Sequence, residues 1–170
     1  MPKRIALIST GGTIEKTYDE LAGVLHNRIS VLDLMLSQLQ LRGIAIDRIS
    51  LMNKDSLEMS DADHDLIART AAEHAAIYDG IVIVHGTDRL AKSGNRLVQR
   101  MPEPRVAIVL TGAMRPWEMR STDALQNLTE ALLAVQLLKP GVYVAMHNHV
   151  LQFPGVEKDP QAGTFVKRTN

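Results

Sequence analysis

Two threonines in this sequence stand directly after glycine and could act in nucleophilic chemistry. Thr13 follows a Gly-Gly pair, and Thr87 stands between Gly86 and Asp88. Glycine lets the backbone adopt conformations that are barred to other residues, so backbone amides can approach a ligand closely. A threonine hydroxyl is a weak nucleophile and needs an adjacent base. The two segments therefore predict a ligand site built from threonine hydroxyls and closely approaching backbone.

A lysine could supply that base if burial and neighbouring groups keep part of it neutral. Lys158 follows the last predicted strand and is the lysine that the topology places best. Surface lysines are far commoner than catalytic ones, so a solvated Lys158 is the alternative. Asp88 also has a second interpretation, because an aspartate at this position could cap the helix that follows it.

Hydroxyl residues gather at the ends of the predicted strands, and each has an ordinary structural explanation. Ser and Thr side chains satisfy exposed backbone amides where a strand gives way to a helix. Two of them depart from this explanation, because they follow glycine and lie where the order of strands is expected to reverse. The strand-end hydroxyl residues are Thr13, Ser56, Thr87 and Thr111, and the two exceptions are Thr13 and Thr87.

Metal and cofactor motifs are missing from the sequence. His147 and His149 flank Asn148, and alternate residues of an extended segment point the same way. No third ligand is evident nearby, so hydrogen bonding at a strand end is preferred over a metal site. His85 is expected to be a packed strand residue. Neither a dinucleotide fingerprint nor a Walker A sequence follows the first strand, so no metal and no cofactor are expected.

The composition is that of an ordinary globular domain. The 170 residues are enough for one domain, and we expect residues 1–170 to form a single α/β unit. Lys plus Arg and Asp plus Glu number 19 each, so no basic excess argues for nucleic acid or an anionic membrane surface. Cysteine is absent, which removes disulfides and thiolate chemistry. No apolar run reaches membrane-spanning length, so a cytoplasmic protein is expected.

Apolar runs and helical patterns alternate along the chain. Strands are predicted at residues 4–9, 44–51, 81–84, 106–110 and 142–146. Helices are predicted at residues 30–43, 60–78, 89–100 and 121–138, with caps at Ser30, Ser60 and either Ser121 or Thr122. Residues 15–27 are expected to form a loop. From residue 147 the chain is expected to be irregular, with its last dozen residues forming a tail or an ordered loop that needs a partner.

This alternation predicts βαβ units with right-handed crossovers and a mainly parallel sheet that is covered by helices on both faces. The expected fold is a three-layer α/β architecture of the flavodoxin or Rossmann type, with strand order 2-1-3-4-5. Such sheets bind ligands at the carboxyl ends of the strands, where the order reverses. Gly12 and Thr13 would then face Thr87 and Asp88 across the crevice. The leucine-rich helices are foremost core, and their wide apolar surface also permits a subunit interface.

Taken together, the motifs resemble the bacterial-type L-asparaginases. The resemblance covers almost the whole chain in the family's order. It is carried by Ser9 to Glu15, Asp55-Ser56 with Met59 and Asp61, His85 to Asp88, Thr111 to Pro116, Ser121 with Asp123, Asn127-Leu128, and Val156 to Lys158. The resemblance implies hydrolysis of L-asparagine to L-aspartate and ammonia, without a cofactor.

The resemblance also implies catalytic roles for particular residues. Thr13 matches the family's primary nucleophile, which attacks the side-chain amide carbon. Thr87, Lys158 and Asp88 match a second triad, in which the lysine relays the proton of the threonine. Tyr18 looks like the tyrosine of the flexible loop that polarises Thr13.

Substrate contacts are implied by the same match. The backbone N–H groups of Gly12 and Thr87 would form the oxyanion hole. Ser56 and Asp88 would hold the substrate's α-carboxylate and α-ammonium groups, and the Ala113 carbonyl would receive the amide nitrogen. The full set of expected substrate-binding residues is Gly12, Asp55, Ser56, Gly86 and Ala113.

Three features depart from the family pattern. Tyr18 comes only five residues after Thr13, where larger members have a longer loop. Leu57 stands where a glutamine is frequent, and typical members are about twice as long, with a C-terminal domain of a neighbouring subunit completing the site. A natural short form that assembles into a homo-oligomer is expected, with truncation as the alternative. An asparaginase-glutaminase, an amidase-like subunit acting on a larger amide, and a non-catalytic amino-acid-binding module remain alternative functions.

Overall fold

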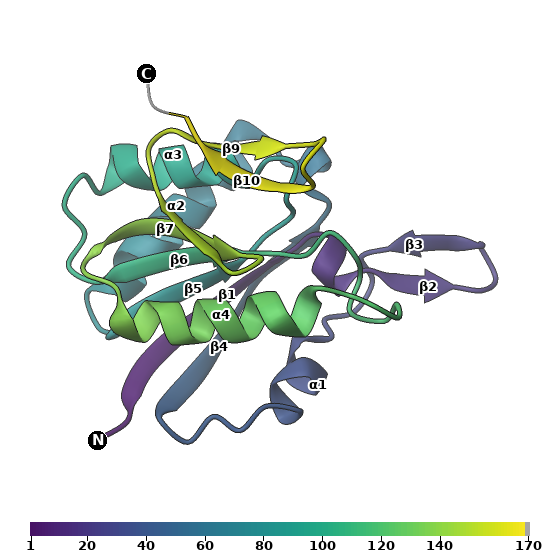
Figure 1. Ribbon diagram of the computed structural model, residues 1–170, viewed down its shortest axis with the longest axis horizontal. Coiled ribbons are helices and arrows are strands. Elements are labelled where there is room, and N and C mark those ends of the chain that lie inside the picture. Colours follow the sequence, from purple (N-terminus) through teal and green to yellow (C-terminus); the bar gives the residue numbers. More distant parts are fainter. Residues whose placement is uncertain (169–170) are drawn as a thin grey trace.

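A six-stranded sheet forms the centre of the protein, in the order β4-β1-β5-β6-β7-β8 (Figure 1). The computed structural model describes residues 1–168. The strands are β1 (Lys3–Gly11), β4 (Ile44–Lys54), β5 (Gly80–Val84), β6 (Ala107–Thr111), β7 (Gly141–Met146) and β8 (His149–Gln152). The first five in space are parallel, and β8 pairs with β7 in the antiparallel direction. In chain order the parallel strands are arranged 2-1-3-4-5, which confirms the predicted order.

Helices cover both faces of the sheet, as the sequence predicts. Successive strand side chains point to opposite faces, so Leu7 enters one core and Ile8 the other. One face packs against α1 (Leu32–Ser37) and α4 (Ala124–Leu137), and the other packs against α2 (Asp61–Ala75) and α3 (Leu90–Arg100). Both faces of the central strands β5, β6 and β7 are therefore buried, which explains the uninterrupted apolar runs of β5 and β6. None of the helices within residues 1–168 is long and apolar enough to cross a membrane.

The helix starts agree with the predictions only in part. The hydroxyl of Ser60 caps α2 in a reciprocal capping box with Asp63, as predicted. The cap predicted at Ser30 is wrong, because the N-cap residue of α1 is Val31. The Ser30 hydroxyl donates to the Glu15 carboxylate and accepts from the Leu32 amide at 3.4 Å. The helix after Thr122 begins at Ala124, whose amide donates to the Thr122 hydroxyl at 3.0 Å.

Residues 15–27 form a hairpin instead of the predicted loop. A short 3₁₀ helix, η1 (Thr13–Glu15), leads into β2 (Thr17–Asp19) and β3 (Val24–His26), which pair in the antiparallel direction. The turn is closed by the Gly23 amide, which donates to the Asp19 carbonyl at 2.7 Å. Figure 1 shows this hairpin projecting from the body of the protein. Because it is solvated on both sides, it lacks the inward-facing apolar alternation by which strands are recognised in sequence.

The predicted irregular tail after His147 is also wrong. The chain adds β8 to the sheet and then forms a second hairpin from β9 (Val156–Asp159) and β10 (Thr164–Lys167). Val156 and Phe165 anchor this hairpin in the core, and Phe153 lies against Gly94 of α3. The prediction for the last dozen residues also covers residues 169–170, which lie outside the described part of the chain.

Candidate active site

Two glycines bring the carboxyl ends of β1 and β5 into backbone contact. Gly12 has a φ of +85°, and a Cβ added to it would lie 2.4 Å from the Gly86 nitrogen. A Cβ added to Gly86 would in turn lie 2.7 Å from the Ser56 side chain, in the short helix η2 (Ser56–Glu58) that follows β4. Any side chain at these glycines would push the strand ends apart. The structure therefore needs glycine here to gather Thr13, Ser56 and Thr87 at one edge of the sheet.

Lys158 reaches this edge from the C-terminal hairpin. Its Nζ lies 2.8 Å from Thr87 Oγ1 and 2.7 Å from Asp88 Oδ1. Thr87 is buried, the Lys158 side chain is 21% exposed and the Asp88 side chain is 45% exposed. A partly dehydrated amine thus contacts both a buried hydroxyl and a solvated carboxylate.

Asp88 does not cap the helix that follows it. The N-cap residue of α3 is Arg89, whose side chain makes no capping hydrogen bond and whose amide donates to Ser56 Oγ. The Asp88 carboxylate instead forms the ion pair with Lys158. The capping interpretation considered for Asp88 from sequence is therefore wrong.

Thr13 and Tyr18 lie differently with respect to this edge. Thr13 is half-buried at the first position of η1, next to Gly12, whose carbonyl accepts from the Asn27 side chain at 2.9 Å. Tyr18 is 54% exposed on the projecting hairpin, and its amide donates to Glu118 Oε2 at 2.6 Å. Among residues 1–168, no hydrogen bond joins the Tyr18 hydroxyl to Thr13.

The Gly12 amide is already engaged. It donates to the Lys54 carbonyl at 2.8 Å, so it is not free to bind an oxyanion in this conformation. This contact contradicts the oxyanion role that the family resemblance implied for the Gly12 amide, because that N–H serves the junction between β1 and β4.

Asp55 and Ser56 are held by neighbouring groups. Asp55 accepts from the Leu57 amide at 3.0 Å and from Lys16 Nζ at 2.6 Å. The hydrogen bond with Lys16 is the main reason that the pKa of Asp55 is lowered, and the charge of Lys158 acts in the same direction. The buried Ser56 hydroxyl accepts from the Arg89 amide at 3.2 Å, which leaves its own hydrogen free to donate.

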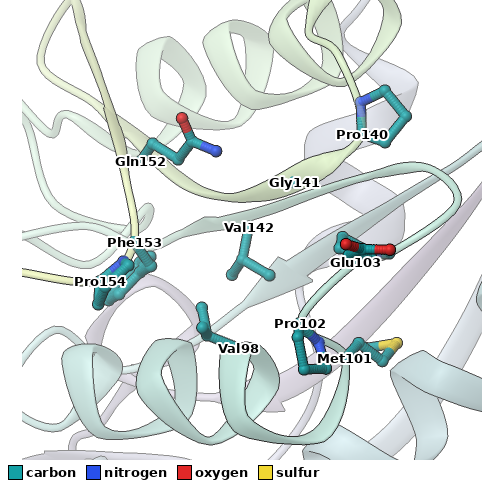
Figure 2. Close-up of a pocket in the computed structure, with 11 residues that line it drawn as sticks. Val98, Met101, Pro102, Glu103, Pro140, Gly141, Val142, Gln152, Phe153 and Pro154 are labelled. Atoms are coloured by element: carbon teal, nitrogen blue, oxygen red, sulfur yellow. The ribbon is translucent and has the colours of Figure 1, made fainter.

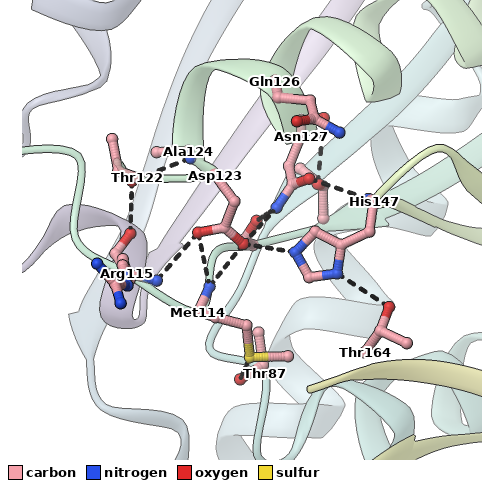
Figure 3. A network of polar contacts seen from close by, with 12 residues as sticks. Thr87, Met114, Arg115, Thr122, Asp123, Ala124, Gln126, Asn127, His147 and Thr164 are labelled. Carbon is pink, nitrogen blue, oxygen red and sulfur yellow. Dashed lines mark hydrogen bonds and ion pairs between the residues drawn. The ribbon is translucent and has the colours of Figure 1, made fainter. Parts of the chain in front are cut away.

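A network around Asp123 supports the loop that carries Ala113 (Figure 3). Its carboxylate accepts from the Met114 and Arg115 amides and from the Asn127 side chain, at 2.9 to 3.1 Å. Asn127 also donates to the Gly112 carbonyl at 2.9 Å. Although burial acts to raise it, the pKa of Asp123 is lowered by the Met114 and Arg115 amides and by His147. The sequence predicts no role for Asp123 or Asn127, although both are among the residues that carry the family resemblance.

His147 joins this network to the C-terminal hairpin. Its Nε2 lies 2.6 Å from Asp123 Oδ2, and its Nδ1 lies 2.9 Å from Thr164 Oγ1 (Figure 3). His147 and Asn148 have φ values of +53° and +62°, so the segment turns and does not extend as the metal-pair alternative required. Within residues 1–168, no group of three or more His, Asp or Glu side chains is arranged to hold a metal ion.

A cavity lies at the end of the sheet where β7 begins, and Thr87 is not among its lining residues (Figure 2). It has a volume of about 390 Å³ and is formed by the end of α3, the start of β7 and the end of β8. Its walls are mostly apolar and proline side chains, with Glu103 as the single ionisable group. Nothing in this cavity resembles the chemistry of the strand ends. Asp55 instead faces a smaller cavity of about 260 Å³, shared with Lys16 and Asn27.

Comparisons with known proteins agree with the motifs. A family model described as "Asparaginase, N-terminal" matches residues 4–161. The L-asparaginase of Thermococcus kodakarensis is 34% identical over 161 residues, which cover 91% of this chain and 47% of that protein. A glutamyl-tRNA(Gln) amidotransferase subunit of Methanococcus vannielii is 33% identical over 150 residues, which cover 87% of this chain and 35% of that protein.

A solved structure shows that the likeness extends to the fold. The thermostable L-asparaginase from Thermococcus kodakarensis superposes with a TM-score of 0.76 and 28% identity, covering 98% of this chain and 56% of that chain. The chain thus spans about half the length of the L-asparaginase it matches. The family model, the similar relatives and the shared fold together show that this chain belongs to the asparaginase family and matches its N-terminal part.

Proposed function

We propose that the chain is an L-asparaginase that hydrolyses L-asparagine to L-aspartate and ammonia. The observation that carries this proposal is the contact of Lys158 Nζ with both Thr87 Oγ1 and Asp88 Oδ1, at 2.8 and 2.7 Å. A hydroxyl with an adjacent base, and the base with an orienting carboxylate, is the arrangement by which weak hydroxyl nucleophiles are activated. Membership of the asparaginase family supports the choice of an amide as substrate.

Thr13 is the proposed nucleophile. Its Oγ1 forms a bond to the amide carbon of asparagine, and the hydroxyl hydrogen passes through Thr87 and Lys158 to the leaving nitrogen, which departs as ammonia. Water then attacks the resulting ester, so aspartate leaves and Thr13 recovers its hydrogen. Asp88 stabilises the ammonium form of Lys158 while the lysine carries the proton, and the Thr87 amide supports the developing oxyanion.

Substrate binding is assigned to the groups around this triad. The Ser56 hydroxyl donates to the α-carboxylate, and the solvated Asp88 carboxylate receives the α-ammonium group. The Ala113 carbonyl, held between the Asn127 and Asp123 contacts, receives the amide nitrogen. Gly12 and Gly86 contribute by allowing the strand ends to approach, and Asp55 by holding η2 and Lys16 in place. Tyr18 is assigned to polarise Thr13, which requires the projecting hairpin to bend toward the site.

A second candidate is an amidase-like subunit that releases ammonia from a larger amide. Leu57 is 57% exposed beside Ser56, where the family frequently has a glutamine, and this change removes one contact to a free amino acid. The relatives named as subunits of a glutamyl-tRNA(Gln) amidotransferase favour the same alternative. Comparing kcat/KM for asparagine, glutamine and glutaminyl peptides separates the two, because a larger-amide enzyme prefers the peptides.

Self-association is proposed for the α4 face. Leu133 and Leu137 of α4 and Val150 of β8 are 57%, 74% and 46% exposed, and together they line a shallow cavity. Covering such apolar side chains with a second copy removes them from water. Light scattering at micromolar concentration is expected to give a homo-oligomer, and a monomer contradicts the assignment.

Ammonia release from L-asparagine by the 170-residue chain tests the proposed function. The Thr13→Ala variant is expected to lose nearly all activity while keeping the melting temperature of the parent. The matched control is Thr129→Ala, a threonine on the exposed side of α4. Activity that survives in a folded Thr13→Ala variant would show that Thr13 is not the nucleophile.

A further inference from the structure

Two histidines and a serine are completely buried beneath the segment that carries Thr87. His64 comes from α2, His85 from the end of β5 and Ser93 from α3, and each is 0% exposed. Ser93 Oγ lies 2.7 Å from His64 Nδ1 and 2.8 Å from His85 Nε2. The two rings are stacked, with their centroids 6.0 Å apart. The proposed reaction uses none of these groups.

The positions of the hydrogen atoms in these hydrogen bonds follow from the Gly86 carbonyl at one end of the series. His85 Nδ1 lies 2.7 Å from the Gly86 carbonyl, which can only accept, so Nδ1 carries the hydrogen. Burial lowers the pKa of His85 to about 4, so the ring is neutral near pH 7 and its Nε2 accepts. Ser93 must then donate its hydroxyl hydrogen to His85 and accept from His64 Nδ1. His64 Nε2 is left as a bare acceptor, and it has no partner within residues 1–168.

The carbonyl at the end of this chain belongs to the residue before Thr87. The backbone from His85 to Gly86 is enclosed by other backbone on two sides. A Cβ on Gly12 would lie 2.5 Å from the Gly86 Cα, and a Cβ on Gly112 would lie 2.3 Å from the His85 carbonyl oxygen. The His85 imidazole holds a third side, through its bond to the Gly86 carbonyl. Because that carbonyl belongs to the peptide that joins Gly86 to Thr87, a change in the ring orientation moves the Thr87 amide and hydroxyl.

We propose that His85, Ser93 and His64 form a hydrogen-bonded positioning chain for Thr87. Each hydrogen bond in it has one direction of donation, and this fixes the orientation of the Gly86–Thr87 peptide. The peptide in turn sets the distance from Thr87 Oγ1 to Lys158 Nζ. This inference rests on the proposed function and extends it to three residues that touch neither substrate nor Lys158. Stability alone does not require these three polar side chains in the core. Apolar side chains would fill the same space and would leave no buried acceptor without a partner, as His64 Nε2 is within residues 1–168. The chain supplies directional specificity to the segment that carries the hydroxyl.

The tautomers give a test that does not depend on activity. The ¹⁵N resonances of histidine-labelled full-length protein at pH 7 report which ring nitrogen carries hydrogen. His85 and His64 are both expected as Nδ1–H tautomers, set by the partners of each ring. An Nε2–H tautomer at His85 overturns the proposal. Because no substrate is involved, this result stands even if the protein releases no ammonia.

The kinetic test removes the hydroxyl of Ser93, which links the two histidines. Ser93→Ala removes the donor to His85 and the acceptor for His64, and kcat for ammonia release is expected to fall about tenfold with KM within twofold, since small misplacements of reacting groups are costly. Ser93→Thr restores the hydroxyl and is expected to recover kcat. Ser50→Ala, at an exposed position on β4, is the matched control and should keep parental kcat. A folded Ser93→Ala variant with parental kcat overturns the proposal.

A second pair of variants applies if Ser93→Ala does not fold. When an asparagine side chain replaces a histidine, its amide nitrogen lies where the histidine Nδ1 was. The amide nitrogen of a glutamine side chain lies where the histidine Nε2 was. His64→Asn keeps the donor to Ser93 and is expected to keep kcat, and His64→Gln is expected to lose about tenfold. Equal kcat values in the two folded variants overturn the proposal. If the parent protein releases no ammonia, the proposed function fails. The histidine tautomers then decide by themselves whether His85, Ser93 and His64 form the proposed hydrogen-bonded chain.

Discussion

Lys158 Nζ lies 2.8 Å from Thr87 Oγ1, although 71 residues separate them in the chain. Thr87 belongs to the segment after β5, and Lys158 belongs to the C-terminal hairpin that leaves the sheet after β8. The hairpin is kept in place by Val156 and Phe165 in the core and by the hydrogen bond of Thr164 with His147. The placement of the proposed base therefore depends on packing outside the parallel sheet.

Replacing Lys158 is expected to abolish most of the ammonia release. Lys158→Met keeps the length of the side chain and removes the amine, and kcat should fall at least about 100-fold, because positioned general acid–base groups contribute factors of that size. Lys158→Arg should be equally inactive, since a guanidinium does not lose its proton in a protein. Steady-state ammonia assays on folded variants measure this. Lys139→Met, at an exposed position, is the control, and an active Lys158→Arg variant would contradict the role of base.

The stability of the protein is expected to fall as the pH is lowered from about 6.5 to about 4. Burial depresses the pKa of His85 from 6.5 to about 4, and the neighbouring His64 acts in the same direction. Between these values the unfolded chain binds a proton that the folded chain does not, so the free energy of unfolding rises with pH in this window. The full effect is about 3 kcal/mol at most for His85, from 1.36 kcal/mol per pKa unit.

Urea unfolding at several pH values measures this slope. His85→Gln should flatten it, because the titrating group is removed. His149→Gln, at an exposed position on β8, should leave it unchanged. A slope in His85→Gln equal to that of the parent would assign the effect to other groups.

Gly94→Ala is expected to destabilise the protein and weaken the site together. A Cβ on Gly94 would lie 2.2 Å from the Phe153 ring, which precedes the hairpin that carries Lys158. Overpacking of this kind costs about 1–3 kcal/mol, which outweighs the gain of roughly 1 kcal/mol from alanine in a helix. Thermal unfolding and ammonia release should both decline. Gly43→Ala is the control, because the nearest atom to its Cβ would be 3.8 Å away, and a parental melting temperature for Gly94→Ala would refute the packing argument.

Asp123→Asn is expected to loosen the loop that presents Ala113. The carboxylate accepts from the Met114 and Arg115 amides, from Asn127 and from His147, and a neutral amide cannot accept all four. The expected loss is about 2–3 kcal/mol in the free energy of unfolding, since hydrogen bonds to charged groups contribute about 1.5–3 kcal/mol each. Chemical denaturation of Asp123→Asn beside Asp65→Asn, an exposed aspartate, measures it. Equal stabilities for the two variants would mean that the network contributes nothing.

Lowering the pH should remove the contribution of the Asp123 carboxylate to the free energy of unfolding. The folded-state pKa of Asp123 is lowered, so its contribution is complete above the unfolded pKa and is lost as the pH falls through the folded value. The difference in unfolding free energy between the parent and Asp123→Asn should therefore shrink below about pH 4, the ordinary aspartate pKa. A difference that stays constant down to about pH 2 would contradict this assignment.

The sequence alone determined the five parallel strands of the sheet and the edge where the site lies, but not the antiparallel strand β8. Buried parallel strands are apolar on both faces, so apolar runs located the central strands, and the alternation of strands with helices predicted their order. The glycines at positions 12 and 86 marked the strand ends that approach each other, because only glycine allows that contact. Ser60 and Asp63 likewise predicted the start of a helix, because a capping box depends only on residues close in the sequence.

Only the tertiary structure decided what depends on contacts between distant segments. The two hairpins carry no strong periodic signal, since one is solvated on both sides and the other is anchored by isolated apolar residues such as Phe165. Asp88 has the local pattern of a helix cap, but its long-range pair with Lys158 prevails. The hydrogen-bonded chain through Ser93 joins two helices and a strand end, so no local spacing could reveal it. Local chemistry sets the elements, and packing between segments far apart in the chain sets the site.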